Sequence, residues 1–351
     1  MFRKTGLVII SAFLLSGCSL SVPSGLGTAG GSIWKSFDGG ATFAPKTFVN
    51  DKQSIGSADV LSFVFDPRDP QIIYIGTKDS GIFKTTDGAE HWEQITFPPL
   101  KVYGLAIDHS NGDRLYASGV YNEISKMYRT DDAGKNWKEI YTEPGKGTVI
   151  TTIGSNPDTP NVLYAGTSAG VVIKSVDSGD SWKNISIAKG PVTGVFFDSG
   201  APNLVRLFIF GQGMAVSNDG GQGWDDYTSQ KLAGFGTSAS PKSITAVIAD
   251  PVYPGLLYAG AQNGLFRSRD GGKAWEAINI IESSRKFPIR AIAINPHSSE
   301  EIAYAAGAAF YKSSDGGVNW ATTQLEINRG ISFIHYDPSD PARIYFTLRK
   351  F

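Results

Sequence analysis

Seven almost continuously apolar segments recur along the chain, and each of them ends in an aspartate or an asparagine. Runs of this kind are typical of strands that are buried on both faces. They are Val60–Asp66, Val102–Asp108, Val149–Asn156, Val192–Asp198, Ile244–Asp250, Ile289–Asn295 and Ile331–Asp337. Most are followed by a proline-containing turn and a second short strand, as in Asp66–Gly76. The pattern therefore predicts a series of similar antiparallel strand units around a shared core.

A polar eight-residue turn, Ser/Thr-x-Asp-x-Gly-x-x-Trp, alternates with these segments, and we call it the Asp turn. Its seven aspartates are Asp38, Asp87, Asp132, Asp177, Asp219, Asp270 and Asp315. Successive aspartates lie 49, 45, 45, 42, 51 and 45 residues apart. A repeat of that length containing four short strands is typical of a β-propeller blade.

Each residue type in the Asp turn has a physical reason. The carboxylate can accept hydrogen bonds from backbone N–H groups two or three residues further on. Gly272 and its equivalents supply the positive φ that a tight hairpin needs, whereas Ala89 stands at this position in one copy and predicts a strained or differently shaped turn. Six copies end in tryptophan and the first ends in Phe43, which predicts an apolar plug in each blade. Because all seven copies share the pattern, we interpret the aspartates as structural and not catalytic.

The order of the elements predicts how the ring closes. The first Asp turn, Ser36–Phe43, precedes every apolar segment, and the last strand pair, ending at Arg343–Leu348, is followed by no Asp turn. We therefore expect Ser32–Lys46 to supply the two outer strands of the final blade, which removes the open sheet edges. The predicted fold is all-β, a single seven-bladed β-propeller of four-stranded antiparallel blades over residues 32–351, closed by pairing of the N- and C-terminal strands.

Residues 1–17 have the pattern of a secretion signal peptide. Arg3 and Lys4 supply a positive start, and the apolar run Leu7–Leu15 is too short to span a bilayer. The signal ends in Leu15-Ser16-Gly17-Cys18, which resembles the lipobox of bacterial lipoproteins. The resemblance implies cleavage before Cys18 and lipidation of that cysteine.

Cys18 is the only cysteine in the sequence, so it has no disulfide partner within the chain, and an ordinary free cysteine is the alternative interpretation. The segment that follows, Ser19–Gly31, is rich in serine and glycine, so residues 18–31 are expected to form a lipidated flexible tether. Acyl chains at Cys18 would hold the protein on the extracytoplasmic side of a bacterial membrane. Ser19 is not the aspartate that favours inner-membrane retention in some bacteria, which favours the outer membrane.

Charge and composition exclude several classes of function. Removing Arg3 and Lys4 from the 32 basic residues leaves 30 against 33 acidic ones, so the mature chain is slightly acidic and is not expected to bind nucleic acid. The four histidines lack metal-ligand spacing and there is no second cysteine, so no metal site is predicted. No cofactor is expected either, and a monomer is the expected state.

Sequence variation is concentrated on one side of the predicted ring. We call the side with the Asp turns the Asp-turn face and the opposite side the loop face. The Asp turns keep a constant spacing, whereas the connections on the loop face vary in length, and binding sites commonly lie on such loops. The longest loops are expected at Thr47–Asp59, Gly119–Lys126, Thr228–Ser243 and Ile280–Pro288.

Basic residues come shortly before the innermost strand in six of the seven predicted blades. They are Lys101, Lys146, Lys189, Lys242, Arg285 with Lys286, and Arg329. This arrangement predicts a positive ring around the mouth of the central channel, which would attract an anionic or carboxylate-rich partner. The alternative is that lysines collect in polar loops by chance.

The Asp turns Ser36–Phe43, Ser217–Trp224, Ser268–Trp275 and Ser313–Trp320 resemble the Asp-box repeats of bacterial neuraminidases. Together with segments such as Asn156–Thr167 (NPDTPNVLYAGT), they are also similar to sortilin-type propellers, to the photosystem II stability and assembly factors, and to xyloglucan-active glycoside hydrolases. The resemblance implies the propeller fold, but its shared motif is a structural turn.

The resemblance transfers few functional residues. Neuraminidases carry an Arg-Ile-Pro motif that this sequence lacks, so we assign no sialidase site. The xyloglucan enzymes use two facing propellers, whereas one is predicted for this chain. The assembly factors are non-catalytic and dock on membrane-protein partners, some through a basic surface, so their plan is the most similar.

The sequence thus favours a lipid-anchored, extracytoplasmic module that binds a protein partner through its loop face, with no catalytic residue assigned. The alternative is a carbohydrate-active or sugar-binding propeller, in which loop-face aromatics would stack on sugar rings. Those aromatics are Tyr121, Phe235 and Phe287. A glycosidase needs two carboxyl groups at one site. The loop-face carboxyls are Asp51, Asp59, Asp79, Glu123, Glu143 and Glu282, and the sequence does not pair them.

Overall fold

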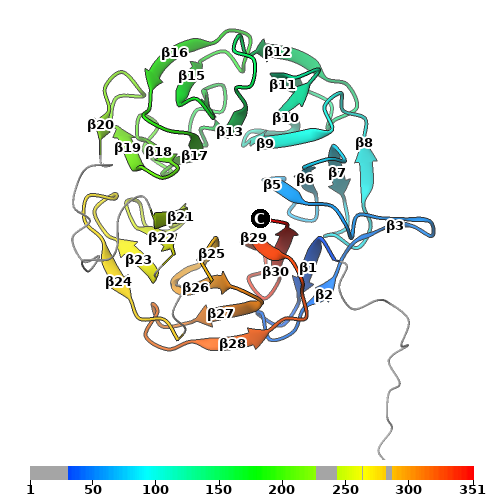
Figure 1. Cartoon of the computed structure of the whole chain (residues 1–351), viewed down its shortest axis with the longest axis vertical. Coiled ribbons are helices and arrows are strands. Elements are labelled where there is room, and N and C mark those ends of the chain that lie inside the picture. The colour runs from blue at the N-terminus through cyan, green and yellow to red at the C-terminus, as the bar shows by residue number, and fades with distance from the viewer. Residues whose placement is uncertain (1–30, 227–242, 263, 282–286) are drawn as a thin grey trace, which may run out of the picture.

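A computed structural model describes residues 31–226, 243–262, 264–281 and 287–351. These residues form seven four-stranded antiparallel sheets that are arranged as blades around a central axis (Figure 1). The predicted all-β, seven-bladed propeller is therefore confirmed. No helix in the described ranges has the length and apolarity needed to cross a membrane.

We number the blades from one to seven in chain order and name the innermost strand of each blade first. Blades 1 and 2 contain β5 (Val60–Phe65), β6 (Ile73–Thr77), β7 (Ile82–Thr85), β8 (Glu93–Ile95), then β9 (Lys101–Asp108), β10 (Asn111–Tyr121), β11 (Ile124–Thr130), β12 (Lys138–Thr142). Blades 3 and 4 contain β13 (Ile150–Ser155), β14 (Leu163–Thr167), β15 (Val171–Ser175), β16 (Lys183–Ile187), then β17 (Val192–Phe197), β18 (Val205–Ile209), β19 (Gly213–Ser217), β20 (Asp225–Asp226). Blades 5 and 6 contain β21 (Ile244–Ala249), β22 (Leu257–Ala261), β23 (Gly264–Ser268), β24 (Glu276–Ile278), then β25 (Ala291–Asn295), β26 (Ser298–Ala306), β27 (Ala309–Ser313), β28 (Ala321–Gln324). Blade 7 contains β29 (Gly330–Tyr336), β30 (Ile344–Arg349), β1 (Ile33–Ser36) and β2 (Ala44–Pro45).

Blade 7 closes the ring in the predicted way. Strand β1 pairs with β30 in antiparallel register, from Ile33 opposite Thr347 to Ser36 opposite Ile344, and β2 covers its outer edge. The two ends of the described chain thus share one sheet, and no blade is left with an inner strand exposed at an open edge.

Neighbouring blades are held together by apolar packing and by hydroxyl groups on the inner strands. The side-chain oxygens of Thr151, Thr245 and Ser332 each donate to a carbonyl of their own blade and to one of the next blade. Each of these residues lies at a β-bulge near the start of its strand. Since the bulge turns one short polar side chain sideways, the blades are linked without leaving an unpaired buried hydroxyl.

The seven Asp turns share one hydrogen-bond pattern. In every copy the leading Ser or Thr hydroxyl donates to the carboxylate of the aspartate at 2.7–2.9 Å. The carboxylate also accepts the N–H of the residue four positions on. The predicted bond from the residue three positions on occurs as well at Asp219 and Asp315. These hydrogen bonds hold the pKa of Asp38, Asp132, Asp177 and Asp315 at about 2. The aspartates are thus engaged in closing their own turns.

Positive φ angles occur at both central positions of every Asp turn, where we predicted only one. Ala89 adopts φ 76° and keeps the hydrogen bond from its N–H to Thr85, so its turn has the common shape in spite of the strain. Ala133 and Ser178 take the preceding left-handed position with φ 59° each. The hydrogen bonds of the turn therefore override the preference for glycine.

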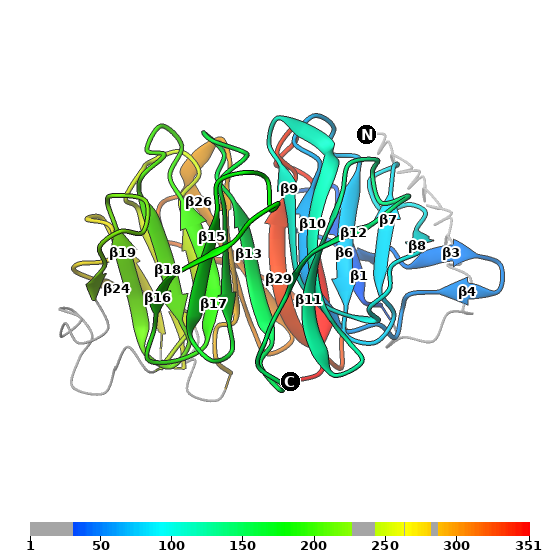
Figure 2. The same cartoon turned by 90° about the horizontal axis from the view of Figure 1, so that it is seen from above.

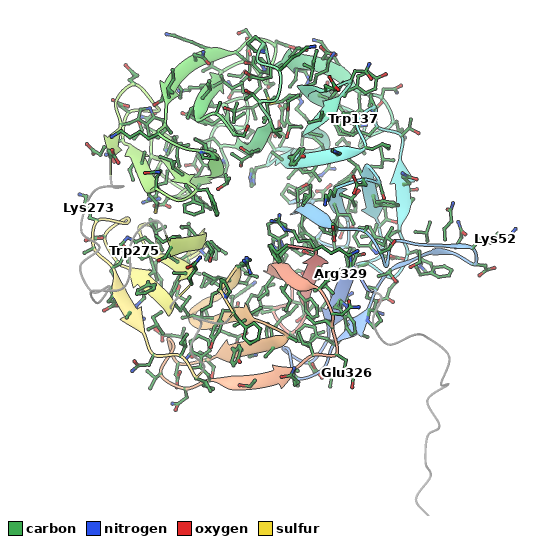
Figure 3. All side chains as sticks on the ribbon, viewed as in Figure 1. Lys52, Trp137, Lys273, Trp275, Glu326 and Arg329 are labelled. Atoms are coloured by element: carbon green, nitrogen blue, oxygen red, sulfur yellow. The ribbon has the colours of Figure 1, made fainter. Side chains whose placement is uncertain are left out.

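Two of the loops predicted on the loop face are ordered hairpins. Gly119–Lys126 is not an extra-long loop, because β10 and β11 continue through it and meet in a two-residue turn at Asn122 and Glu123. Within Thr47–Asp59, strands β3 (Phe48–Asn50) and β4 (Gln53–Ser54) form a hairpin that projects sideways from the ring with Lys52 at its tip (Figures 2 and 3).

Candidate binding surface on the loop face

Three of the predicted ring cations are exposed on the loop face. Lys101 begins β9, Lys146 lies between β12 and β13, and Lys189 lies between β16 and β17. The side chain of Lys189 is 81% exposed, and its Nζ is 3.7 Å from the carboxylate of Asp226. The remaining cations Lys242, Arg285 and Lys286 lie outside the described residues, as does Cys18.

Arg329 differs from the other ring cations because its guanidinium is buried. The side chain is only 7% exposed, and it donates to the carbonyls of Gly31, Gly56, Ser57 and Ala58 at 2.6–3.2 Å. Its Nη1 also lies 3.5 Å from Asp59. The donors of Arg329 are therefore used to join the last blade to the segment that enters the first blade (Figure 3).

Replacing Arg329 by glutamine is expected to lower the free energy of unfolding by about 2–3 kcal/mol, because four carbonyls, three of them in part-buried contacts, lose a charged donor. The midpoint of urea unfolding, followed by intrinsic tryptophan fluorescence, measures the loss. Lys146→Gln is the matched control, since that lysine is exposed and should change stability by less than about 0.5 kcal/mol. Equal midpoints for the two variants would contradict the role assigned to Arg329.

A pair of arginines that our sequence analysis did not identify, Arg290 and Arg349, lies at the mouth of the channel. The guanidinium carbons of Arg290 and Arg349 each lie 4.4 Å from the ring centre of Phe351. The backbone N–H of Lys350 donates to Asp59 at 2.8 Å. In Figure 1 this end of the chain lies close to the axis, and in Figure 2 it lies at the loop face. The exposed aromatic side chain of Phe351 thus brings two cations together near the central axis of the propeller.

Arg349 has unused hydrogen-bonding capacity. Its Nε is buried and makes no hydrogen bond. Burial lowers the pKa of Arg349, and the nearby positive charge of Arg290 lowers it further. Two like charges held in proximity favour an added negative charge, so an anionic group would be stabilised at this position.

Exposed apolar side chains accompany these cations on the loop face. They are Leu100, Tyr121, Ile187, Phe210, Ile281, Phe287 and Phe351. Aromatic and aliphatic groups beside charged ones are typical of protein–protein contact surfaces. Tyr121, at the end of β10, is 43% exposed, and Phe235 lies outside the described residues.

The loop-face carboxyls of the described residues differ in exposure and in their partners. Glu143 is buried and accepts a hydrogen bond from Tyr141, while Asp59 is held by Lys350 and Arg329. Asp51, Asp79 and Glu123 are exposed on separate segments, and Glu282 lies outside the described residues. No group of three or more acidic, histidine or cysteine side chains in the described ranges has a geometry suited to a metal ion.

The fold and this surface define the chain as a seven-bladed β-propeller that carries cationic and apolar side chains on one rim. Solved structures with the same fold include YCF48 from Cyanidioschyzon merolae, with a TM-score of 0.63 and 17% identity, covering 83% of this chain and 95% of that chain. A structure of YCF48 bound to D1 peptide has a TM-score of 0.64 and 18% identity, covering 84% and 93%.

A second group of similar structures consists of glycoside hydrolases. The GH74 xyloglucanase from Xanthomonas campestris has a TM-score of 0.68 and 16% identity, with 83% of this chain and 51% of the enzyme covered. The chain thus spans about half the length of that enzyme. No family model and no curated protein matches the sequence. At these identities the comparisons show the fold alone, and propellers of this kind occur in binding proteins and in enzymes.

Proposed function

We propose that the chain is a lipid-anchored, extracytoplasmic, non-catalytic module that binds a carboxylate-rich protein segment through its loop face. The observation that carries the proposal is the convergence of Arg290 and Arg349 on Phe351, on a face that also exposes Lys101, Lys146 and Lys189 and several apolar side chains. The near-complete overlap with YCF48, which has been solved with a bound peptide, supports a protein partner. Membrane attachment rests on the lipobox resemblance at Cys18, and loss of the chain from the membrane fraction in a Cys18→Ser variant tests it.

The electrostatic part of the proposal predicts a charge-dependent affinity. A triple variant with Lys101, Lys146 and Lys189 changed to glutamate should bind a fluorescent poly-glutamate peptide at least about tenfold more weakly at low salt, because several exposed cations are reversed. Fluorescence anisotropy gives the Kd, and an uncharged poly-glutamine peptide reports binding that does not depend on charge.

The control variant carries the same change in net charge at exposed sites in or next to the Asp turns, with Lys135, Lys138 and Lys183 changed to glutamate. At about 0.1 M salt, where the Debye length is about 10 Å, its affinity for poly-glutamate should remain within about threefold of the parent value. If both triple variants lose affinity to the same extent, overall charge and not the loop face determines binding, and the proposal fails.

A carbohydrate-active propeller is the second candidate, favoured by the structural likeness to the xyloglucanase. The exposed ring of Tyr121 also lies beside the two-residue turn that contains Glu123. A panel of chromogenic glycosides tests it with the parent chain and a Glu123→Gln variant. Turnover by the parent that the variant loses would support this candidate over the protein-binding module.

A further inference from the structure

A comparison of the blades with one another reveals one exceptional junction. In blades 1, 2, 3, 5 and 7 a tyrosine of the second strand lies opposite a lysine or arginine of the third strand. The pairs are Tyr74 with Lys84, Tyr116 with Arg129, Tyr164 with Lys174, Tyr258 with Arg267 and Tyr345 with Lys35. Blade 6 keeps the third-strand cation as Lys312 opposite Ala303. Blade 4 instead places Arg206 opposite Val216, so its cation has moved to the second strand.

In blades 2, 3, 5 and 7 the third-strand cation links its blade to a carbonyl in the Asp turn of the next one. In blade 3, Tyr164 Oη and Lys174 Nζ both donate to the Gly220 carbonyl, at 3.0 and 2.8 Å. In blade 7, Tyr345 Oη and Lys35 Nζ donate in the same way to the Gly88 carbonyl, at 3.4 and 2.7 Å. These junctions are filled by an aromatic ring and closed by two hydrogen bonds.

Arg206 does not reproduce this link. Its Nη1 donates to Asp198 at 2.6 Å, and both side chains are almost completely buried. Asp198 also accepts the N–H of Gly255 at 2.9 Å from blade 5. In the described part of the chain, no side chain of blade 4 donates to the carbonyl of Gly271, the equivalent residue of the next Asp turn. The Nε of Arg206 is buried and has no hydrogen-bond partner.

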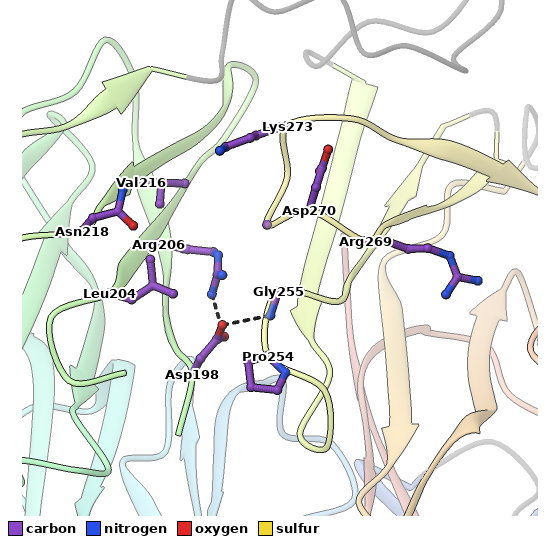
Figure 4. A pocket seen from close by; sticks show the side chains of 11 residues that line it. Asp198, Leu204, Arg206, Val216, Asn218, Pro254, Gly255, Arg269, Asp270 and Lys273 are labelled. Carbon is purple, nitrogen blue, oxygen red and sulfur yellow. Dashed lines mark hydrogen bonds and ion pairs between the residues drawn. The ribbon is translucent and has the colours of Figure 1, made fainter. Parts of the chain in front are cut away.

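A recess of about 340 Å³ lies between blades 4 and 5, where five of the other six junctions hold a tyrosine ring and a cation (Figure 4). Leu204, Val216 and Pro254 give it apolar walls. Figure 4 shows Lys273 of the blade 5 Asp turn reaching toward the recess from above, whereas Arg269 points away from it. Asp270 is satisfied by its own turn, since it accepts from Ser268 and from the N–H of Ala274.

We propose that this recess binds a small organic monocarboxylate, with its apolar part against Leu204, Val216 and Pro254 and its carboxylate between Arg206 and Lys273. Two carboxylates line the recess, but Asp198 is paired with Arg206 and Asp270 is held by its own turn, whereas Lys273 makes no ion pair in the described part of the chain and can take a single negative group. The guanidinium of Arg206 lines the recess, and a guanidinium suits a carboxylate acceptor. The site lies on the Asp-turn face, opposite the surface of the proposed function, so the two can fail separately.

Fluorine NMR of the full-length chain tests the proposal with para-fluorobenzoate and its uncharged analogue para-fluorobenzamide. We expect the carboxylate to bind at least about tenfold more tightly than the amide, since it alone forms charge-assisted hydrogen bonds. Lys273→Gln, an exposed change that should leave the fold intact, is expected to weaken carboxylate binding several-fold. Lys135→Gln is the matched control, because Lys135 holds the same position in the Asp turn of blade 2, and its binding should equal that of the parent.

The double variant Asp198→Asn/Arg206→Tyr should abolish binding, because it gives blade 4 the Asn156 and Tyr164 pair of blade 3 and fills the recess with a ring. Equal affinity for the acid and the amide would overturn the proposal. It would also be overturned by unchanged carboxylate binding in the double variant, or by equal losses in the Lys273 and Lys135 variants.

Discussion

Replacing Trp275 by alanine is expected to lower the free energy of unfolding by about 3–5 kcal/mol. The indole is 3% exposed and belongs to the core between blades 4 and 5, with Phe208, Met214 and Leu257. Its Nε1 donates to the Gly272 carbonyl at 3.1 Å. Truncation therefore removes a large apolar group and also leaves a buried carbonyl without its donor.

Urea unfolding monitored by circular dichroism measures this loss, since it does not depend on the tryptophan removed. Trp182→Ala is the matched control: the indole of Trp182 makes the same bond to the Gly179 carbonyl, at 3.0 Å, but is only partly buried. We expect the midpoint to fall less for Trp182→Ala. Equal falls would show that the closing hydrogen bond, and not burial of the ring, accounts for the stability.

The sequence was sufficient to predict the ring of blades because several independent patterns repeat along it with the same period. The seven apolar strands, the seven Asp turns and the displaced first turn at Ser36–Phe43 agree on the same blade count and on closure through blade 7. The Asp-turn hydrogen bonds are local, so residue types alone indicate them. Agreement between local and global patterns is what makes such a fold predictable.

The loop face was less predictable because its contacts join segments that are distant in sequence. Arg329 and the carbonyls of Gly56 and Ala58 are separated by more than 270 residues, so nothing near Arg329 indicated that its guanidinium would be buried. Arg290 and Arg349 meet only because Phe351 lies between them. Loop-face cations can be listed from a sequence, but their exposure depends on how the ring brings these segments together.

The exception in blade 4 was visible in the sequence, although its consequence was not. Aligning the second strands would have shown Arg206 in a column of five tyrosines and one alanine, and aligning the third strands would have shown Val216 in a column of cations. A buried arginine in such a position requires a partner, and Asp198 eight residues earlier was the nearest acidic residue of that blade. Whether the exchange leaves the junction filled or open depends on side-chain packing, which only the structure defines.

The buried ion pair of Asp198 with Arg206 gives the second prediction of a large loss of stability. Asp198→Ala is expected to lower the free energy of unfolding by about 3–5 kcal/mol, because Arg206 would keep a buried charge without a partner. The N–H of Gly255 would lose its acceptor in the same variant. Because the cost comes mainly from the charge left behind, removing that charge as well should restore most of the stability.

The double variant Asp198→Asn/Arg206→Tyr makes this distinction. Asparagine keeps an acceptor for Gly255, and tyrosine fills the junction as Tyr164 does beside Asn156 in blade 3. We expect the urea midpoint of the double variant to lie closer to the parent value than that of Asp198→Ala. In a double-mutant cycle with the single variants Asp198→Asn and Arg206→Tyr, the coupling energy should be at least about 1 kcal/mol. If the stability losses of the two single variants add up to the loss of the double variant, Asp198 and Arg206 do not depend on each other. The aspartate then does not compensate for the buried arginine of blade 4.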